Sequence, residues 1–209
     1  MELKRIAMGS NFGNEGGGMH LVSTSVSIEE SLFTRNFAFQ GGVIFALQKS
    51  TVRVERSWLV QNLATDGSVM VAVANIADDS LHFEDCYFIE NYGKSNSIHI
   101  LLSSMTINNS TFTNNYAQSV THGVTLISSN LRISNSLIQF ERHCHWTWSL
   151  SQQAFVEVCG ESDFFARLDL RKLDTGFFNL YLTSFAEITG NTTVQHLLAQ
   201  KQAVASVIG

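Results

Sequence analysis

The sequence contains no proline and few charged residues, and both features narrow the choice of fold. None of its 209 residues is Pro, the four charged residue types make up 15% of the chain, and 44% of it is hydrophobic. Pro is excluded from the interior of hydrogen-bonded sheets, so its absence is consistent with a chain built largely of strands. A disordered chain would carry more charge and fewer apolar residues. The composition therefore indicates a folded chain that can bury a sizeable core.

The charge balance and the lack of long apolar runs exclude two classes of partner. The formal net charge is −5, and Lys and Arg form no cluster along the chain, which disfavours nucleic acid. A membrane-spanning helix needs about 18 consecutive apolar residues, and the longest candidate, Val69 to Ala77, is short enough to be a strand. We therefore expect neither nucleic-acid binding nor membrane insertion. The opening MELKRIAMGSNFG lacks the apolar stretch of a secretory signal, which leaves an intracellular location open.

Cysteine is scarce, and its three copies do not fix the compartment. Cys86 opens CYFIEN, one copy of a short repeat in which the copies SLFTRN, SWLVQN and STFTNN have Ser at this position. We therefore expect Cys86 to be a small buried residue. Cys144 and Cys159 lie 15 positions apart and would form a disulfide only in an oxidising compartment, so their pairing stays open here. The same compartment would be needed to glycosylate the sequons at Asn108, Asn109 and Asn191.

The sequence does contain a recurring short pattern, an apolar residue followed three positions later by Asn. The complete copies are IAMGSN, SLFTRN, SWLVQN, CYFIEN and STFTNN, ending at Asn11, Asn36, Asn62, Asn91 and Asn115. Successive Asn residues are 25, 26, 29 and 24 positions apart, and a degenerate sixth copy, SLIQFE, covers residues 136–141. This spacing is typical of one structural unit repeated along the chain.

Columns of like residues surround each copy. Two apolar columns precede it, namely Val26, Val52, Leu81, Met105 and Leu131, and Ile28, Val54, Phe83, Ile107 and Ile133. Between them lies a mostly polar column, Ser27, Arg53, His82, Thr106 and Arg132, so each copy predicts a strand with alternating inward and outward side chains. A third apolar column within the copies is Met8, Phe33, Leu59, Phe88, Phe112 and Ile138. Small residues follow each Asn: Gly13, Ala38, Ala64, Gly93 and Ala117.

A repeat with only short strands cannot bury its own apolar face, so successive copies must stack. We predict an all-β fold, a right-handed parallel β-helix of about six coils over residues 1–140, in which like residues form ladders about 4.8 Å apart. The Asn column is expected at a tight bend, with each Asn in the left-handed αL conformation and its amide bonded to the amides above and below. A leucine-rich repeat would require an LxxLxL pattern that the chain lacks.

The FxxN copies at Phe33 to Asn36, Phe88 to Asn91 and Phe112 to Asn115, together with Gly41 and Gly42 followed by Val43 and Ile44, carry a family resemblance. Over about residues 5–140 the chain resembles the repeats of polymorphic outer-membrane proteins and related pectin-lyase-like surface proteins. The resemblance implies an adhesin-like protein that is extracellular or exposed at the cell surface.

The repeat pattern fades after Phe140, so we treat residues 141–209 as an irregular C-terminal continuation and cap. Alternating strands are expected to continue the coil, and residues 184–191 faintly echo the repeat. Apolar residues at Val194, Leu197, Leu198 and Ala205 predict a terminal capping helix, with Thr192 or Thr193 as its N-cap. Because coil one begins almost at Met8, we expect either a fragment of a longer chain or a first coil docked on a partner.

Two groups of residues could carry chemistry, and neither completes a site. Asp78 and Asp79 form a local acid pair beside His82, but neighbouring repeats offer Ser rather than further carboxylates. His143 and His145 would share one face of a strand with Glu141, yet no second ligand group accompanies these three. We therefore predict no catalytic, cofactor-binding or metal-binding residues, and no cofactor.

Two functions remain. The first is a non-catalytic structural or adhesin-like module that binds a protein or glycan surface through flat outer faces bearing Trp58, Tyr92 and Tyr116. The alternative is a polysaccharide lyase or glycoside hydrolase of the pectin-lyase-like fold, with its site around Asp78 and Asp79. The enzyme requires Asp78, Asp79, His82 and His99 to meet in one cleft.

Overall fold

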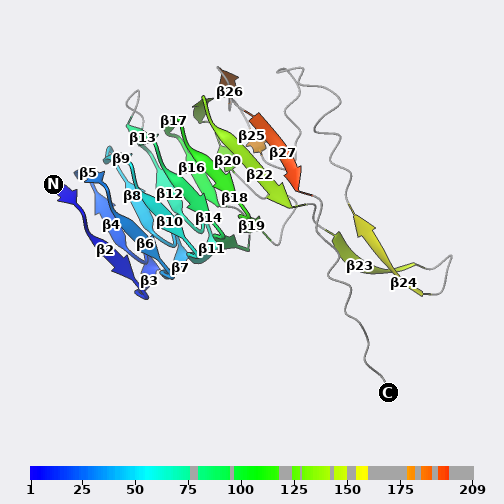
Figure 1. The fold of residues 1–209 in the computed structure, drawn as a ribbon. Helices are drawn as coiled ribbons and strands as arrows, with labels where there is room; N and C mark the ends of the chain where they lie inside the picture. Colours follow the sequence, from blue (N-terminus) through cyan, green and yellow to red (C-terminus); the bar gives the residue numbers. More distant parts are fainter. Residues whose placement is uncertain are drawn as a thin grey trace.

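The chain folds into a parallel β-solenoid, which confirms the predicted all-β class. The computed structural model describes residues 1–75, 80–94, 97–117, 124–127, 129–141, 144–149, 154–159, 178–181, 185–189 and 193–197. Every element in these ranges is a strand, and the strands form four parallel sheets plus one antiparallel pair. Figure 1 shows the coils stacked side by side, with the N-terminus at one end of the stack.

Each of the first five coils visits the four sheets, A to D, in turn, and strands from successive coils are neighbours in every sheet. Sheet A contains β1 (Glu2–Lys4), β5 (Ser25–Glu29), β9 (Thr51–Glu55), β13 (Leu81–Glu84), β17 (Ser104–Asn108), β21 (Asn130–Ser134) and β26 (Phe185–Thr189). Sheet B contains β2 (Ala7–Gly9), β6 (Leu32–Thr34), β10 (Trp58–Val60), β14 (Tyr87–Ile89), β18 (Thr111–Thr113), β22 (Leu137–Glu141) and β27 (Thr193–Leu197).

The other two parallel sheets close the coil, and a separate hairpin follows. Sheet C contains β3 (Phe12–Glu15), β7 (Phe37–Gln40), β11 (Leu63–Asp66), β15 (Tyr92–Gly93) and β19 (Tyr116–Ala117). Sheet D contains β4 (Met19–Val22), β8 (Ile44–Leu47), β12 (Met70–Val73), β16 (Ile98–Leu101), β20 (Val124–Ile127) and β25 (Phe178–Tyr181). Sheet E is the antiparallel pair of β23 (Cys144–Ser149) and β24 (Ala154–Cys159).

The strand register confirms the apolar columns read from the sequence. In sheet B, Leu59 lies opposite Phe33 on one side and Phe88 on the other, and Phe88 lies opposite Phe112. The rings of Phe88 and Phe112 stack with their centroids 4.2 Å apart and their planes 2° from parallel. These side chains are almost completely buried, and each contributes on the order of 1.5–3 kcal/mol to stability.

The Asn column stacks in one line along the B–C corner, as predicted. The side-chain Nδ2 of each Asn donates to Oδ1 of the Asn in the next coil, over 2.9–3.1 Å, from Asn11 through Asn36, Asn62 and Asn91 to Asn115. The expectation that Asn itself adopts αL is wrong. The residue before it takes that conformation, for example Arg35 (φ 54°) and Gln61 (φ 55°). The bend precedes the Asn so that its side chain can turn inward and reach the ladder.

A second ladder of small polar residues lies at the A–B corner, where the sequence has Ser or Cys. The backbone N–H of Ser31 donates to Oγ of Ser57, and the N–H of Cys86 donates to Oγ of Ser110. Each Ser hydroxyl in turn donates to the carbonyl two residues before it, such as Ser57 to Glu55. These ladders satisfy backbone groups that the bends would otherwise leave unpaired inside the coil.

Glycines allow the tight turn between sheets C and D. Gly41 has a φ of +63°, and a Cβ at this position would lie 2.2 Å from the carbonyl oxygen of Ile44. Gly42 is required for a different reason, because a Cβ at this position would lie 2.2 Å from the carbonyl oxygen of Ser68 in the next coil. The glycine run at this turn therefore serves close backbone approach between coils.

Three strands beyond residue 141 continue the parallel sheets. β25, β26 and β27 pair in parallel with β20, β21 and β22. The predicted helix is wrong over Thr193–Leu197, which is strand β27. β27 forms a parallel ladder of five residue pairs with β22. This ladder stabilises a strand more than the helical spacing of the apolar residues stabilises a helix. Leu198 and Ala205 lie outside the described residues.

Candidate functional site

The proposed meeting of acids and histidines in one cleft is not found for the described members. Asp78 and Asp79 lie outside the described residues. His82 belongs to β13 of sheet A, and its Nε2 lies 3.3 Å from Oε2 of Glu84 on the same strand. His99 belongs to β16 of sheet D and binds a different carboxylate. The two histidines therefore serve separate faces of the solenoid.

His99 forms a close pair with Asp66, which ends strand β11 in the preceding coil. Its Nδ1 lies 2.6 Å from Oδ2 of Asp66, and both side chains are about one-fifth exposed, at 21% and 22%. An ionised carboxylate only accepts hydrogen bonds, so Nδ1 carries the proton and donates. In the neutral imidazole this leaves Nε2 as an acceptor, the tautomer used by general bases and metal ligands.

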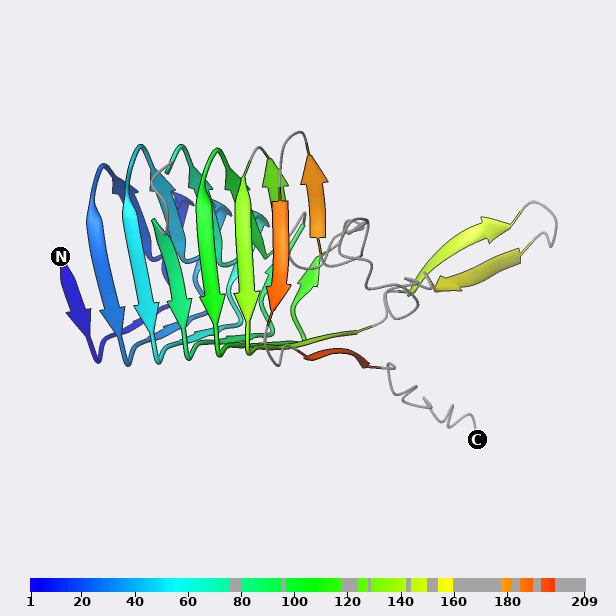
Figure 2. The ribbon, with the colours of Figure 1, turned by 90° about the horizontal axis from the view of Figure 1, so that it is seen from above.

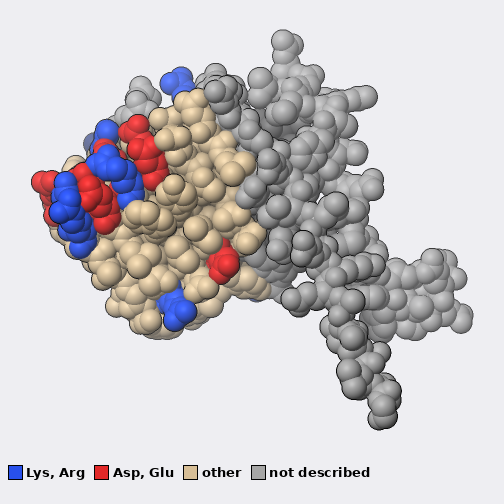
Figure 3. All heavy atoms as spheres, viewed as in Figure 1, with Lys and Arg blue, Asp and Glu red and all other residues tan. Residues whose placement is uncertain are grey.

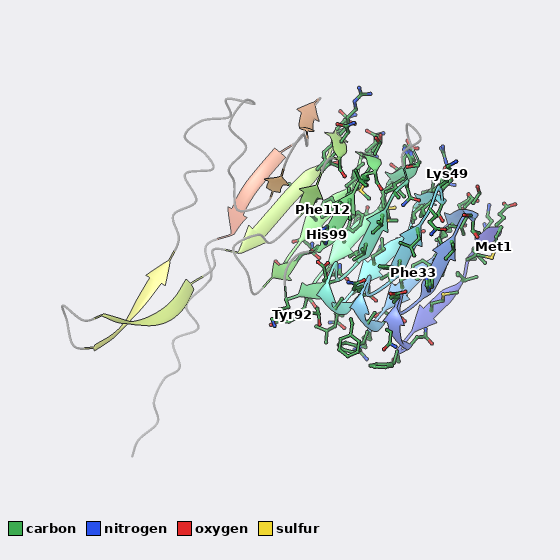
Figure 4. The ribbon with its side chains drawn as sticks, turned by 180° about the vertical axis from the view of Figure 1, so that it is seen from behind. Met1, Phe33, Lys49, Tyr92, His99 and Phe112 are labelled. Carbon is green, nitrogen blue, oxygen red and sulfur yellow. The ribbon has the colours of Figure 1, made fainter. Side chains whose placement is uncertain are left out.

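The pair lies at the turn between sheets C and D, which we call the C–D corner and define by Asp66, Ser68, Val71 and His99. Val71 lies opposite His99 in the outward column of sheet D, yet it is only 4% exposed. Ser68 is fully buried at the same turn. The contact joins the end of β11 in sheet C to β16 in sheet D, and Figure 4 labels His99.

Several polar atoms at the C–D corner are buried without a hydrogen-bond partner among the described residues. They are Oδ1 of Asp66, Oγ of Ser68 and Nε2 of His99. Because Nε2 points away from the carboxylate that Nδ1 binds, Nε2 and Oδ1 of Asp66 cannot hold one small ion between them. Sequence reasoning missed Asp66, since its contact spans 33 positions and joins two different columns of adjacent coils.

Aromatic side chains occupy the outer faces of sheets B and C, and we call this set the aromatic surface: Phe12, Phe37, Phe39, Trp58, Tyr87 and Tyr92. Trp58 and Tyr87 stack across β10 and β14 with ring centroids 5.7 Å apart, and they are 43% and 42% exposed. Phe12 stacks on Phe37 at 5.2 Å and is 70% exposed. The expected exposure of Trp58 and Tyr92 is confirmed, while the side chain of Tyr116 lies outside the described ones.

Charged side chains instead concentrate on the outer face of sheet A and the bend after it. Lys4 and Arg56 both bind Glu29, and Arg5 binds Glu30 through Nε at 2.6 Å. Hydrogen bonds from Lys4 and then Arg56 lower the pKa of Glu29 below its ordinary value. Figure 3 shows Lys, Arg, Asp and Glu side chains gathered toward one side of the described surface, beside a wide area where charged groups are sparse.

Cys86 is buried as expected and is unsuited to nucleophilic chemistry. Burial raises the pKa of its thiol to about 12, although a hydrogen bond from the Ser57 backbone opposes this. The thiol donates to the carbonyls of Glu84 and Val54, in the way a Ser hydroxyl does at this corner. Since the thiolate is the reactive form, Cys86 has a structural role.

Two residues of the group around His143 belong to different strands. Glu141 ends strand β22 of sheet B, whereas His145 belongs to β23 of sheet E, so the two do not share one strand. His143 lies outside the described residues. Elsewhere, the described part of the chain contains no group of three or more His, Cys, Asp or Glu side chains arranged to hold a metal ion. It also contains no helix with the length and apolarity to cross a membrane.

Fold and surface together define the class of the protein as a parallel β-solenoid with polar ladders at its corners and an aromatic outer surface. Comparisons with protein-family models, with curated proteins and with solved structures found no match. The solenoid class is therefore the level at which the chain is assigned.

Proposed function

We propose that the protein is a non-catalytic recognition module, in which the rigid solenoid presents the aromatic surface to a protein or glycan partner. The observation that supports this most directly is the exposed stack of Trp58 on Tyr87. Trp and Tyr are enriched where proteins bind partners, because each combines a large apolar area with a polar group. On the family resemblance, we place this activity at the cell surface or outside the cell.

The separation of charge from aromatic residues also supports the proposal. The carboxylates of sheet A are held by neighbouring Lys and Arg side chains, so that face offers largely compensated charge. The aromatic surface lacks such pairs among its own residues and would release ordered water when covered. The bend between sheets B and C adds Arg35 and Glu90, which Gln61 joins by hydrogen bonds, so few charges interrupt the aromatic surface. A large, weakly charged face on a rigid support suits an extended partner.

A photo-crosslinking experiment tests the proposal directly. A photoreactive phenylalanine analogue replaces Trp58 in one variant and Arg53, on the outer face of sheet A, in a control variant. We expect crosslinks to a protein partner, or to an oligosaccharide in a defined panel, at position 58 and not at position 53. Equal labelling at both positions, or labelling at neither, would contradict the proposal.

A matched substitution separates binding from folding. Trp58→Ala with Tyr87→Ala should lower the affinity for the partner at least about tenfold, because such aromatic anchors typically carry 2 kcal/mol or more of binding energy. Thr51→Ala, an exposed position on sheet A, should leave the affinity unchanged. Circular dichroism and the melting temperature confirm that the variants keep their fold.

The alternative function, a carbohydrate-active enzyme, is favoured by one observation. The contact with Asp66 orients the imidazole of His99 as a general base requires, although its buried Nε2 would have to become exposed for a substrate to reach it. For this candidate, the protein would cleave a polysaccharide, His99→Gln would abolish the cleavage, and Asp66→Asn would reduce it. Binding through the aromatic surface with no cleavage would favour the recognition module.

A further inference from the structure

Strands β23 and β24 form a hairpin that is hydrogen-bonded, among the described strands, only within itself. It lies in the part of the chain between β22 and β25, where the chain leaves the parallel sheets and later returns to them. Figure 2 shows the hairpin projecting away from the stacked coils. An isolated two-stranded hairpin is only marginally stable in water, so this element needs a further constraint.

The register of the hairpin places its two cysteines directly opposite each other. Cys144 is the first residue of β23, Cys159 is the last residue of β24, and they are Cα partners in the antiparallel ladder. Opposed residues in such ladders have Cα atoms about 4.5–5.5 Å apart. Disulfides join residues whose Cα atoms are about 4.4–6.8 Å apart, so the backbone already has a suitable spacing.

We propose that Cys144 and Cys159 form a disulfide that closes the base of this hairpin when the protein meets an oxidising environment. Among the three cysteines only this pair is opposed in a ladder, since Cys86 is fully buried in the solenoid core. The disulfide would hold the two strands of the hairpin together at the end where the chain enters and leaves it. The inference is independent of the proposed recognition function.

The reaction balances with a small-molecule disulfide such as oxidised glutathione as the oxidant. The thiolate of one cysteine attacks a sulfur of oxidised glutathione, which forms a mixed disulfide and releases one glutathione thiolate. The thiolate of the second cysteine attacks the protein sulfur of that mixed disulfide and releases the other. The protein loses two electrons and two protons, and glutathione is reduced to two thiols.

Thiol counting on the full chain tests the proposal. Reduced protein is equilibrated with excess oxidised glutathione, denatured, alkylated with iodoacetamide and weighed by mass spectrometry. We expect one alkylated cysteine per chain after oxidation and three after reduction, with a peptide map that links Cys144 to Cys159. Three free thiols after oxidation, a bond between two chains, or a bond involving Cys86 would each overturn the proposal.

A register control distinguishes alignment from simple proximity. In Val158→Cys with Cys159→Ser, the cysteine moves by one residue, and strand alternation places it on the opposite face of the hairpin. We expect its intramolecular bond with Cys144 to form at least about tenfold less favourably, because the Cβ atoms no longer face each other. Equally favourable bonding would overturn the argument from register. Protection of Cys86 from alkylation before denaturation confirms that each variant is folded.

Discussion

The polar ladders show how a single residue can determine the register of a whole coil. Oδ1 of Asn62 accepts hydrogen bonds from both the backbone N–H and the side-chain Nδ2 of Asn36. Its own Nδ2 donates to Oδ1 of Asn91 and to the carbonyl of Phe33. A coil shifted by one residue would leave all of these buried groups unpaired, so the ladder favours one register strongly.

Asn62→Ala should therefore destabilise the protein more than the loss of one hydrogen bond. Two donors of Asn36 lose their acceptor, and an unpaired buried group costs about 1–3 kcal/mol, so we expect a loss of roughly 2–5 kcal/mol in the free energy of unfolding. Chemical denaturation measures it. Asn11→Ala, at an exposed position in the first coil, is the control and should cost below about 1 kcal/mol. Equal losses at both positions would contradict a role in register.

Cys86 should make stability depend on pH in the alkaline range. Its pKa is about 12 in the folded protein and 9.0 as the reference for an unfolded thiol. Between these values the unfolded chain loses a proton that the folded chain keeps, so stability falls as the pH rises. The slope from this group approaches about 1.4 kcal/mol per pH unit. Denaturation from pH 8 to 11 should show a steeper decline than in Cys86→Ser, and parallel curves would contradict this explanation.

At the scale of elements, the alternation within each short strand decides what the core contains. In β14, Phe88 points inward and is fully buried, while its neighbour Tyr87 points outward and is 42% exposed. The stacking of Phe88 between the Leu59 and Phe112 positions joins three coils through one column. Although β14 has only three residues, it is held by β10 on one side and β18 on the other.

Phe88→Ala and Phe112→Ala should each destabilise the protein by roughly 3–5 kcal/mol, the range for truncating a buried aromatic residue. The cost includes both lost burial and the cavity left between coils. Thermal and chemical denaturation provide the measurement, with Tyr87→Ala as the outward control on the same strand. The interpretation fails if the loss for Phe88→Ala is below about 1 kcal/mol, far under the range for core truncation.

At the scale of the whole molecule, the solenoid distributes different chemistry over different faces. Sheet A and its bend carry paired charges, sheets B and C carry the aromatic surface, and the C–D corner holds the pair of His99 and Asp66. Outward aromatic residues recur in successive coils of sheets B and C, which gives the proposed recognition surface its extended form.

We expect the purified protein neither to cleave polyuronates, with or without Ca²⁺, nor to retain stoichiometric metal. Among the described residues no group of three or more His, Cys, Asp or Glu side chains is arranged to hold a metal ion, and the neighbouring carboxylates of Glu29 and Glu55 on sheet A are both bound by Arg56. Partner binding should survive Asp78→Asn with Asp79→Asn, because the proposed surface lies on sheets B and C. Reducing-sugar release and elemental analysis give the measurements. Cleavage that the double substitution abolishes would establish the enzyme instead.

The path of the coil follows from the repeat in the sequence, because each ladder joins the same position in neighbouring copies. Because the same residue type recurs at the positions of Asn62 and Phe88, the repeat shows where each of these residues lies in its coil. It also shows which residue of the next coil each one contacts. The prediction that Asn adopts αL failed because the pattern locates a bend without showing which residue makes it.

Tertiary structure alone decided the contacts between unlike positions. The meeting of Asp66 with His99 depends on how sheet C turns into sheet D, and no column of the repeat encodes that angle. The same holds for Thr193–Leu197. The spacing of its apolar residues favours a helix, but in the folded chain this segment pairs with β22 as a parallel strand. The opposition of Cys144 and Cys159 likewise follows from hairpin register, which a separation of 15 positions in the sequence does not specify. The repeat determines the contacts between equivalent positions of neighbouring coils, whereas the contacts between different positions depend on how the whole chain packs.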